Sequence, residues 1–315
     1  MKHQKLLAAA AALALLCGCG SAAPDAAETP APTAQQTAAP AQTDGYTDAT
    51  FADPDAKVTL ILNGAKIDCT VAPGVVFYSV YECDNAWETR ESYGAAVDTG
   101  AAQKKARKTD GAFYSYVSMN VTGGAEGSGV LNITSTFEGL DTELHLTVNG
   151  GSLHILAGLG SEGDGIDSNG YVVINGGTVV ALASPMADSG LDSDCGTYVN
   201  GGTVVALGAS MDWAESDGSE NAGQAAVNLS FSQRQSADEA IVITDTDGKV
   251  VFAYDPDKDE VAEGNARWYS GTILSAPGLT VGGEYYIYVG GDVEGEVVFS
   301  LSEKVNGFTG VRDTE

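Results

Sequence analysis

One phrase recurs three times in this chain, at intervals of 25 or 26 residues. Its copies begin at Glu138, Asp164 and Ser189, and each contains N-G-G followed by an apolar run. A looser copy lies upstream, from Asp110 to Thr134. A tandem period of this length without a helical pattern is typical of solenoids, in which each repeat forms one coil and packs against the next. The sequence therefore predicts a stack of coils made of parallel β-strands.

Each repeat has strands separated by a glycine corner. Apolar residues occupy every second position, as Val172 and Ile174 do in the second copy, which is typical of strands with one buried face. The paired glycines give the backbone the freedom to turn between strands. Neighbouring coils lie about 4.8 Å apart, so equivalent residues stack in columns. We expect an all-β, right-handed parallel β-helix with two strands and one turn per coil. A hydrogen-bonded ladder should join the N-G-G asparagines, Asn149, Asn175 and Asn200.

The same stacking places acidic residues in columns. In such a column, like charges about 4.8 Å apart repel by roughly 1 to 3.5 kcal/mol per pair. A Ca²⁺ ion offsets this repulsion, because two carboxylate–calcium bonds of about 2.4 Å span the coil spacing. The competing interpretation is that the aspartates cap turns and stay solvated. The candidate calcium ligands are Asp141, Asp167 and Asp192 in one column, Glu138 and Asp164 in a second, and Asp188 and Asp194 close by.

The N-terminal residues carry targeting features. Two lysines precede a short apolar run from Leu6 to Leu16, which is typical of a removable signal and too short to span a membrane. The following L-C-G-C is similar to a bacterial lipoprotein box and predicts lipidation at Cys19. We expect residues 1–19 to be a lipoprotein signal peptide and residues 20–50 a disordered tether. The folded part would then be an extracytoplasmic, cell-surface lipoprotein attached to the membrane by its lipid. An ordinary secretory signal is the alternative.

The charge of the chain restricts its partners. A formal net charge of −28 over 315 residues excludes a nucleic-acid-binding surface, which needs basic patches, and suits an extracellular, calcium-rich setting. No Lys or Arg occurs from Thr109 to Gln233. Three cysteines follow the signal, an odd number that implies no disulfide scaffold, and a pairing of Cys69 with Cys83 stays open. We expect a monomer.

Two structural units follow the tether. The repeats, preceded by a strand-like stretch from Val58, place the β-helix at residues 51–222. Residues 223–315 form a C-terminal β subdomain of strands and turns, including a hairpin around Asp247-Gly248. An open solenoid end exposes strand edges and apolar surface. We therefore expect this small antiparallel unit to pack on the end of the solenoid.

The ordered phrases DGAFYS, GSGVLNIT, DGIDSNG, INGGTVVALA and GEYYIYVGG together resemble a bacterial family of secreted, calcium-binding parallel β-helix domains that bind carbohydrate. The likeness covers roughly residues 55–295. It implies a polysaccharide-lyase-like fold used for binding pectin-type and cellulosic polysaccharides, with Asp164, Asp167 and Glu138 as calcium ligands. The third copy departs from the pattern, since Ser189 stands where the motif has Asp.

The residue pattern favours a binding protein over an enzyme. A lyase on this fold needs a Lys or Arg to remove the proton alpha to a uronate carboxylate, and the coils contain neither from Thr109 to Gln233. A glycosidase needs two carboxylates, a requirement that any stacked aspartates satisfy. We assign no catalytic residue. A glycoside hydrolase or lyase stays the alternative, as does a purely structural surface or adhesion protein. Trp213 and Tyr198 are the candidates for stacking on the sugar rings of a polysaccharide.

Overall fold

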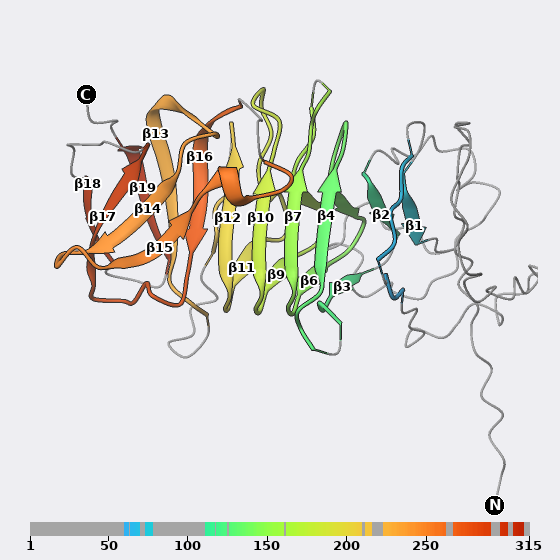
Figure 1. Cartoon of the computed structure of the whole chain (residues 1–315), viewed down its shortest axis with the longest axis horizontal. Coiled ribbons are helices and arrows are strands. Elements are labelled where there is room, and N and C mark those ends of the chain that lie inside the picture. The colour runs from blue at the N-terminus through green and yellow to red at the C-terminus, as the bar shows by residue number, and fades with distance from the viewer. Residues whose placement is uncertain are drawn as a thin grey trace, which may run out of the picture.

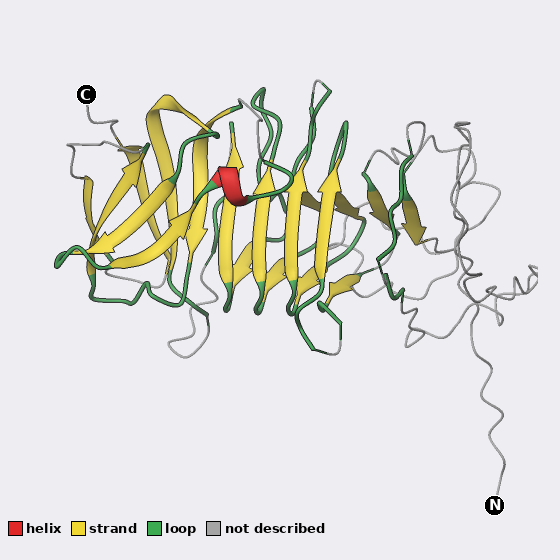
Figure 2. Ribbon diagram, viewed as in Figure 1, coloured by secondary structure: helices red, strands yellow, loops and turns green. Residues whose placement is uncertain are grey.

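The chain folds as an all-β solenoid of parallel strands with antiparallel strands at its C-terminal end (Figure 1). Within the part of the chain that is described, regular helix is limited to one 3₁₀ turn, η3 (Pro256–Lys258), and no helix is long and apolar enough to cross a membrane (Figure 2). The predicted signal peptide with Cys19, the predicted tether and Cys83 lie outside the described residues. This computed structural model describes residues 60–62, 64–69, 73–77, 111–116, 118–124, 126–160, 162–209, 212–215, 223–262, 267–290, 297–301 and 305–311.

Each full coil contributes one strand to each of three parallel sheets, which gives a solenoid of about four turns. The first sheet contains β1 (Val75–Phe77), β2 (Phe113–Ser115), β5 (Leu140–Thr142) and β8 (Ile166–Ser168). The second contains β3 (Met119–Val121), β6 (Leu146–Val148), β9 (Val172–Ile174) and β11 (Thr197–Val199). The third contains β4 (Val130–Thr134), β7 (Ser152–Leu156), β10 (Thr178–Leu182) and β12 (Thr203–Gly208).

The first sheet corrects the expectation of two strands and one turn per coil. The segment around each motif aspartate forms a third strand of only three residues, as in β5 and β8. Leu140 and Ile166 are fully buried at the start of these strands, and Ser168 is 1% exposed at the end of β8. Each of these strands has a single apolar residue between a glycine and an aspartate, a composition that is typical of turns.

The predicted columns are present in the core. Val148 pairs with Ile174 and Ile174 with Val199, and these side chains are buried between the sheets. The asparagine ladder is confirmed: Asn175 donates to Asn149 Oδ1 at 2.9 Å, and Asn200 donates to Asn175 Oδ1 at 2.9 Å. At the adjoining corner, a Cβ on Gly177 would lie 2.4 Å from a backbone oxygen of the coil before it, and the backbone has φ +85°. Only glycine fits there without strain.

The earliest strand among the described residues is β1, which pairs in parallel with β2. The described part of the stretch that follows Val58, residues 60–62 and 64–69, contains no strand, and Ile61 is 80% exposed. An apolar alternation becomes a strand only where a neighbouring coil supplies hydrogen-bond partners, and β1 has that partner.

The third sheet continues past the last coil into the C-terminal unit. Strand β16 (Trp268–Ser275) pairs antiparallel with β12, and β13 (Ala226–Ser236) pairs antiparallel with β16. Strand β19 (Val305–Val311) then pairs in parallel with β13. The open edge of the last coil is therefore closed by hydrogen bonds. Strand β13 therefore lies in this wall and extends the third sheet beyond the last coil.

A second antiparallel sheet completes the C-terminal unit. Its order is β15 (Val250–Tyr254), β14 (Ile241–Asp245), β17 (Glu284–Val289) and β18 (Val297–Ser300). The predicted hairpin joins β14 to β15, and Gly248 at its turn has φ +79°.

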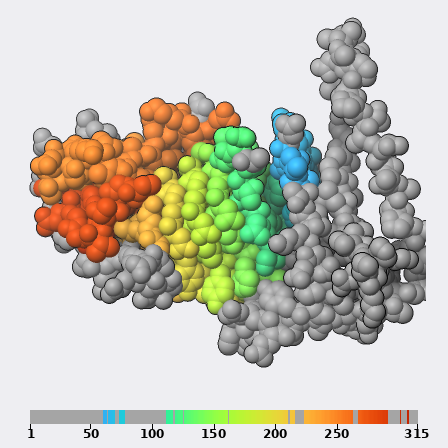
Figure 3. Space-filling view, turned by 90° about the horizontal axis from the view of Figure 1, so that it is seen from below, coloured from blue at the N-terminus to red at the C-terminus, as the bar shows by residue number. Residues whose placement is uncertain are grey.

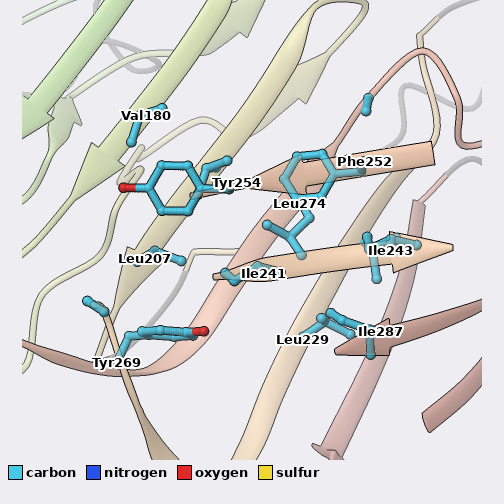
Figure 4. Packing of buried hydrophobic residues seen from close by; sticks show 14 of the residues in the cluster. Val180, Leu207, Leu229, Ile241, Ile243, Phe252, Tyr254, Tyr269, Leu274 and Ile287 are labelled. Atoms are coloured by element: carbon cyan, nitrogen blue, oxygen red, sulfur yellow. The ribbon is translucent and has the colours of Figure 1, made fainter. Parts of the chain in front are cut away.

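The second sheet buries the outer face of the solenoid's third sheet near its end. Tyr254, Phe252 and Ile241 form one apolar cluster with Val180 and Leu207 (Figure 4). Figure 3 shows the stacked coils in green and yellow with the orange and red C-terminal strands packed at one end. This face of β10 and β12 is therefore core and not ligand-binding surface.

Candidate functional site

The motif aspartates lie in one column on the outside of the first sheet. Asp141 in β5 is the register partner of Asp167 in β8. Leu191 forms a parallel bridge with Ile166, and the Asp192 amide donates to the Ile166 carbonyl at 2.8 Å. Asp192 is thus the next rung of the same column. Because Ile166 and Leu191 are fully buried, the alternation of the strand directs the aspartate side chains outward.

The second predicted column lies three residues earlier in each coil. The Gly139 amide donates to the Asp164 carbonyl at 3.0 Å, which places Glu138 beside Asp164 on neighbouring coils. Ser189 occupies the next rung, as the sequence alignment of the repeats predicts. Its amide donates to Asp164 Oδ1 at 2.5 Å. Asp188, one residue earlier, accepts a hydrogen bond from the Gly163 amide at 3.1 Å.

Asp212 is a member of this site that sequence reasoning missed. The Ser193 amide donates to Asp192 Oδ1 at 3.0 Å and to Asp212 Oδ2 at 3.1 Å. The Asp212 carboxyl group is close enough to Asp192 to raise its pKa. Asp212 follows the last N-G-G repeat and has no counterpart in the earlier copies. The only sequence signal for Asp212 is its position directly before the candidate Trp213, in the polar stretch M-D-W-A-E.

We call this group the acidic cluster. Burial, and then the proximity of Asp167, Asp188 and Glu138, raise the pKa of Asp164 to about 7, against an opposing hydrogen bond from Ser189. Burial, the hydrogen bond with Asp212 and the charge of Asp164 raise the pKa of Asp192 to about 8. Burial and Asp212 also raise the pKa of Asp194. The acidic cluster consists of Glu138, Asp164, Asp167, Asp188, Asp192, Asp194 and Asp212.

Asp141 differs from the other predicted ligands in its surroundings. It is 9% exposed and is the register partner of Tyr114 as well as of Asp167. The Tyr114 hydroxyl donates to Glu143, and burial, this bond and the charge of Asp141 raise the tyrosine pKa. The structure thus places Asp141 at the end of the column, next to a buried tyrosine, rather than among the carboxyl groups that perturb Asp164 and Asp192.

The donor chemistry of the acidic cluster is that of a hard cation site. Its side chains offer carboxylate oxygens only, which are the ligands that Ca²⁺ takes in proteins. Burial and other carboxyl groups raise the pKa values of Asp164 and Asp192, and the main opposing influence on Asp164 is the Ser189 amide rather than a cationic side chain. As the side chains stand, no group of three or more His, Cys, Asp or Glu among the described residues is arranged around a common point that would hold a metal ion.

The two candidate aromatic residues lie on neighbouring rungs at the last coil. Ala214 bridges Thr197 in parallel, so Trp213 and Glu215 flank it on the outer side, and Glu215 is next to Tyr198. The Asn228 side chain fixes both backbone groups of Ala214 at 3.0 Å. Trp213, which directly follows Asp212, is 40% exposed.

Tyr198 is less available than Trp213. Its ring lies 5.9 Å from the ring of Tyr171, and Tyr171 in turn stacks on His145 at 5.0 Å. Its hydroxyl donates to Glu215 at 3.3 Å. These rings follow the coil spacing and cover part of one another. Trp213 is therefore the stronger candidate for contact with a sugar ring.

The comparisons with known proteins match the solenoid part of the chain. A family model described as carbohydrate-binding domain-containing protein matches residues 43–224, more than half of the sequence. No curated protein matches the chain, and no solved structure does so. The match includes every residue of the acidic cluster and both candidate aromatic residues.

The acidic cluster predicts how stability depends on pH when calcium is removed. An aspartate in an unfolded chain has a pKa of about 3.9. Asp164 and Asp192 therefore hold protons in the folded state that the unfolded chain has lost between about pH 4 and pH 8. The free energy of unfolding should fall as pH rises through this window. In chelator, the melting temperature should be lower at about pH 8 than at about pH 5.

Asp192→Asn should raise the melting temperature at about pH 8 and flatten this dependence, because it removes a buried charge. Asp247→Asn, in the exposed turn of the β14–β15 hairpin, serves as the control and should leave the slope unchanged. Identical slopes for the wild-type protein and Asp192→Asn would contradict this assignment. Differential scanning calorimetry at several pH values measures both.

Proposed function

Because this chain belongs to the family of carbohydrate-binding domain-containing proteins, we propose that it is an extracytoplasmic lipoprotein that binds a plant-type polysaccharide of the pectin or cellulose class without cleaving it. The observation that carries the proposal is the family match over residues 43–224, which covers the coils and their acidic and aromatic residues. The surface proposed for binding is the outer side of the last coil, where Trp213 follows Asp212.

An exposed tryptophan beside carboxylates suits a saccharide. The indole ring contacts the apolar face of a sugar, and the oxygen atoms around it accept hydrogen bonds from sugar hydroxyls. The residue after Trp213 is Ala214, whose backbone amide and carbonyl both form hydrogen bonds with the Asn228 side chain. Little conformational freedom of this segment would be lost on binding, which favours affinity.

We further propose that Ca²⁺ binds at the acidic cluster, held by Asp164, Asp167, Asp192 and Asp212 with Glu138 beside them. Calcium would neutralise carboxylates that otherwise repel one another, and it would attract a uronate carboxylate to a protein whose net charge is −28. Two observations support this proposal. The donor set consists of oxygen atoms only, and burial together with neighbouring carboxyl groups raises the pKa values of Asp164 and Asp192.

Calcium should raise the melting temperature, because a ligand that binds only the folded state stabilises it. The rise should be larger at about pH 8 than at about pH 5, since the ligands must lose their protons to bind the ion. Asp192→Asn should abolish most of the rise, whereas Asp247→Asn should keep it. Equal melting temperatures in excess calcium and in excess chelator would contradict the proposal that calcium binds at the acidic cluster.

Trp213→Ala should weaken binding to polygalacturonate or cellulose roughly tenfold or more, as expected for a central aromatic contact. Val250→Ala, which trims an exposed apolar residue of the C-terminal unit, is the control and should bind as the wild type does. Depletion of the protein from solution by the insoluble polysaccharide measures the affinity. Unchanged binding by Trp213→Ala would show that the polysaccharide does not bind at the proposed surface.

A glycoside hydrolase is the second candidate function, favoured by one observation. Asp192 holds its proton at neutral pH beside other carboxyl groups, and a protonated and an ionised carboxyl group form the usual catalytic pair of such enzymes. The same polysaccharide incubations test this. Release of reducing ends that disappears in Asp192→Asn would replace the binding protein with an enzyme.

Membrane attachment through Cys19 is proposed from the sequence alone. The lipoprotein box and the tether would hold the solenoid away from the membrane surface. Cys19→Ser should release the protein into the medium or block its maturation, measured by fractionation and mass spectrometry of the N-terminus. A processed Cys19→Ser variant that stays in the membrane fraction would show that no lipid anchor at Cys19 is needed.

A further inference from the structure

An arginine–tryptophan pair stands on the C-terminal unit, beyond the residues matched by the family. The guanidinium carbon of Arg234 in β13 lies 4.5 Å from the ring centroid of Trp268 in β16. Trp268 is 50% exposed and Arg234 is exposed. The pairing of β13 with β16 brings them together: Trp268 is the register partner of Ser236, and the register of β13 shifts between Ser230 and Gln235.

The hydrogen-bond donors of this pair are unused within the described part of the chain. No carboxylate of a described residue lies within 4.0 Å of the Arg234 guanidinium, although Asp and Glu outnumber Lys and Arg by 43 to 15 over the whole sequence. The indole N–H of Trp268 likewise makes no hydrogen bond there. A guanidinium and an indole N–H only donate, so the pair fits a ligand that is rich in acceptor oxygens.

The pair is held rigidly at one end of the row of turns that carries the acidic cluster. The adjacent Arg267 donates to the carbonyl oxygens of Ala157 at 2.5 Å, Gly158 at 2.7 Å and Ala183 at 2.8 Å. The Ser270 hydroxyl donates to the Ala209 carbonyl at 2.7 Å.

The Ala209 amide in turn donates to the carbonyl of Asp188, a member of the acidic cluster. The start of β16 is therefore fixed to the turns themselves. A saccharide that lies along this end of the wall can reach both the pair and the turns.

We propose that Arg234 and Trp268 form a contact site for an anionic saccharide, in which the guanidinium binds a uronate carboxylate and the indole N–H donates to a sugar oxygen. Stacking on Trp268 orients the planar guanidinium while its N–H edge stays open for a two-point bond to a carboxylate. The ligand class rests on the carbohydrate binding proposed above. The site supplies an attractive contact for an acidic sugar on a surface that otherwise repels it.

The test uses the full chain saturated with calcium at low ionic strength. Trigalacturonate is the acidic probe, and its fully methyl-esterified form is the neutral probe. Arg234→Gln should weaken binding of the acid about fivefold or more and leave binding of the ester unchanged. Lys249→Gln, an exposed residue of the β14–β15 turn, removes the same charge elsewhere and should have no effect. Isothermal titration calorimetry measures both affinities.

Two further variants locate the contact. Arg234→Lys keeps the charge but not the planar fork, and should recover only part of the affinity for the acid. Binding of the acid should change the tryptophan fluorescence of the wild-type protein, and Trp268→Phe should lose that part of the change.

Equal affinities of Arg234→Gln and Lys249→Gln for the acid would overturn the inference while the proposed function stands. Failure of the wild-type protein to bind either saccharide would overturn both.

Discussion

In-register hydrogen bonding between parallel strands of successive coils is the constraint on which the rest of this structure depends. It places every residue directly beside its equivalent one repeat away. Apolar residues such as Val148 and Ile174 then form continuous buried columns, and Asn149, Asn175 and Asn200 exchange side-chain hydrogen bonds along the surface. Because the backbone fixes the register, the protein has no freedom to separate residues that repel. Favourable and unfavourable columns have the same origin.

The acidic cluster is the unfavourable case. Asp164 and Asp192 meet other carboxyl groups in a partly buried setting, and burial together with these neighbours raises their pKa values to about 7 and about 8. A fold that only needed stability would place neutral residues there. The carboxyl groups sit next to Asp212 and Trp213, where the last coil exposes an aromatic ring. A bound cation would relieve this repulsion, which is a physical reason to propose a calcium-dependent carbohydrate surface at this position.

The repeat period was sufficient to predict the coils, the asparagine ladder and the stacking of Asp141 on Asp167, because each follows from counting along the chain. Other features depend on contacts between segments that no local pattern links. Strand β16 pairs antiparallel with β12 and so covers the edge that the last coil would otherwise leave open. Asp212 joins the acidic cluster through the fold of the last coil, outside the repeat. Arg234 reaches Trp268 only because β13 pairs with β16. Strands β5 and β8 of the first sheet have a glycine and an aspartate around a single apolar residue, which is typical of a turn.

We propose that the strand register forces carboxylates together at a site that binds a cation and a saccharide. A crystal structure of the full chain grown with calcium and an oligogalacturonate tests it most directly, with anomalous scattering to identify the ion. The account predicts calcium bound among Asp164, Asp167, Asp192 and Asp212, and a saccharide on the outer side of the last coil at Trp213. A well-ordered acidic cluster that is free of calcium, with the saccharide bound elsewhere or absent, would contradict it.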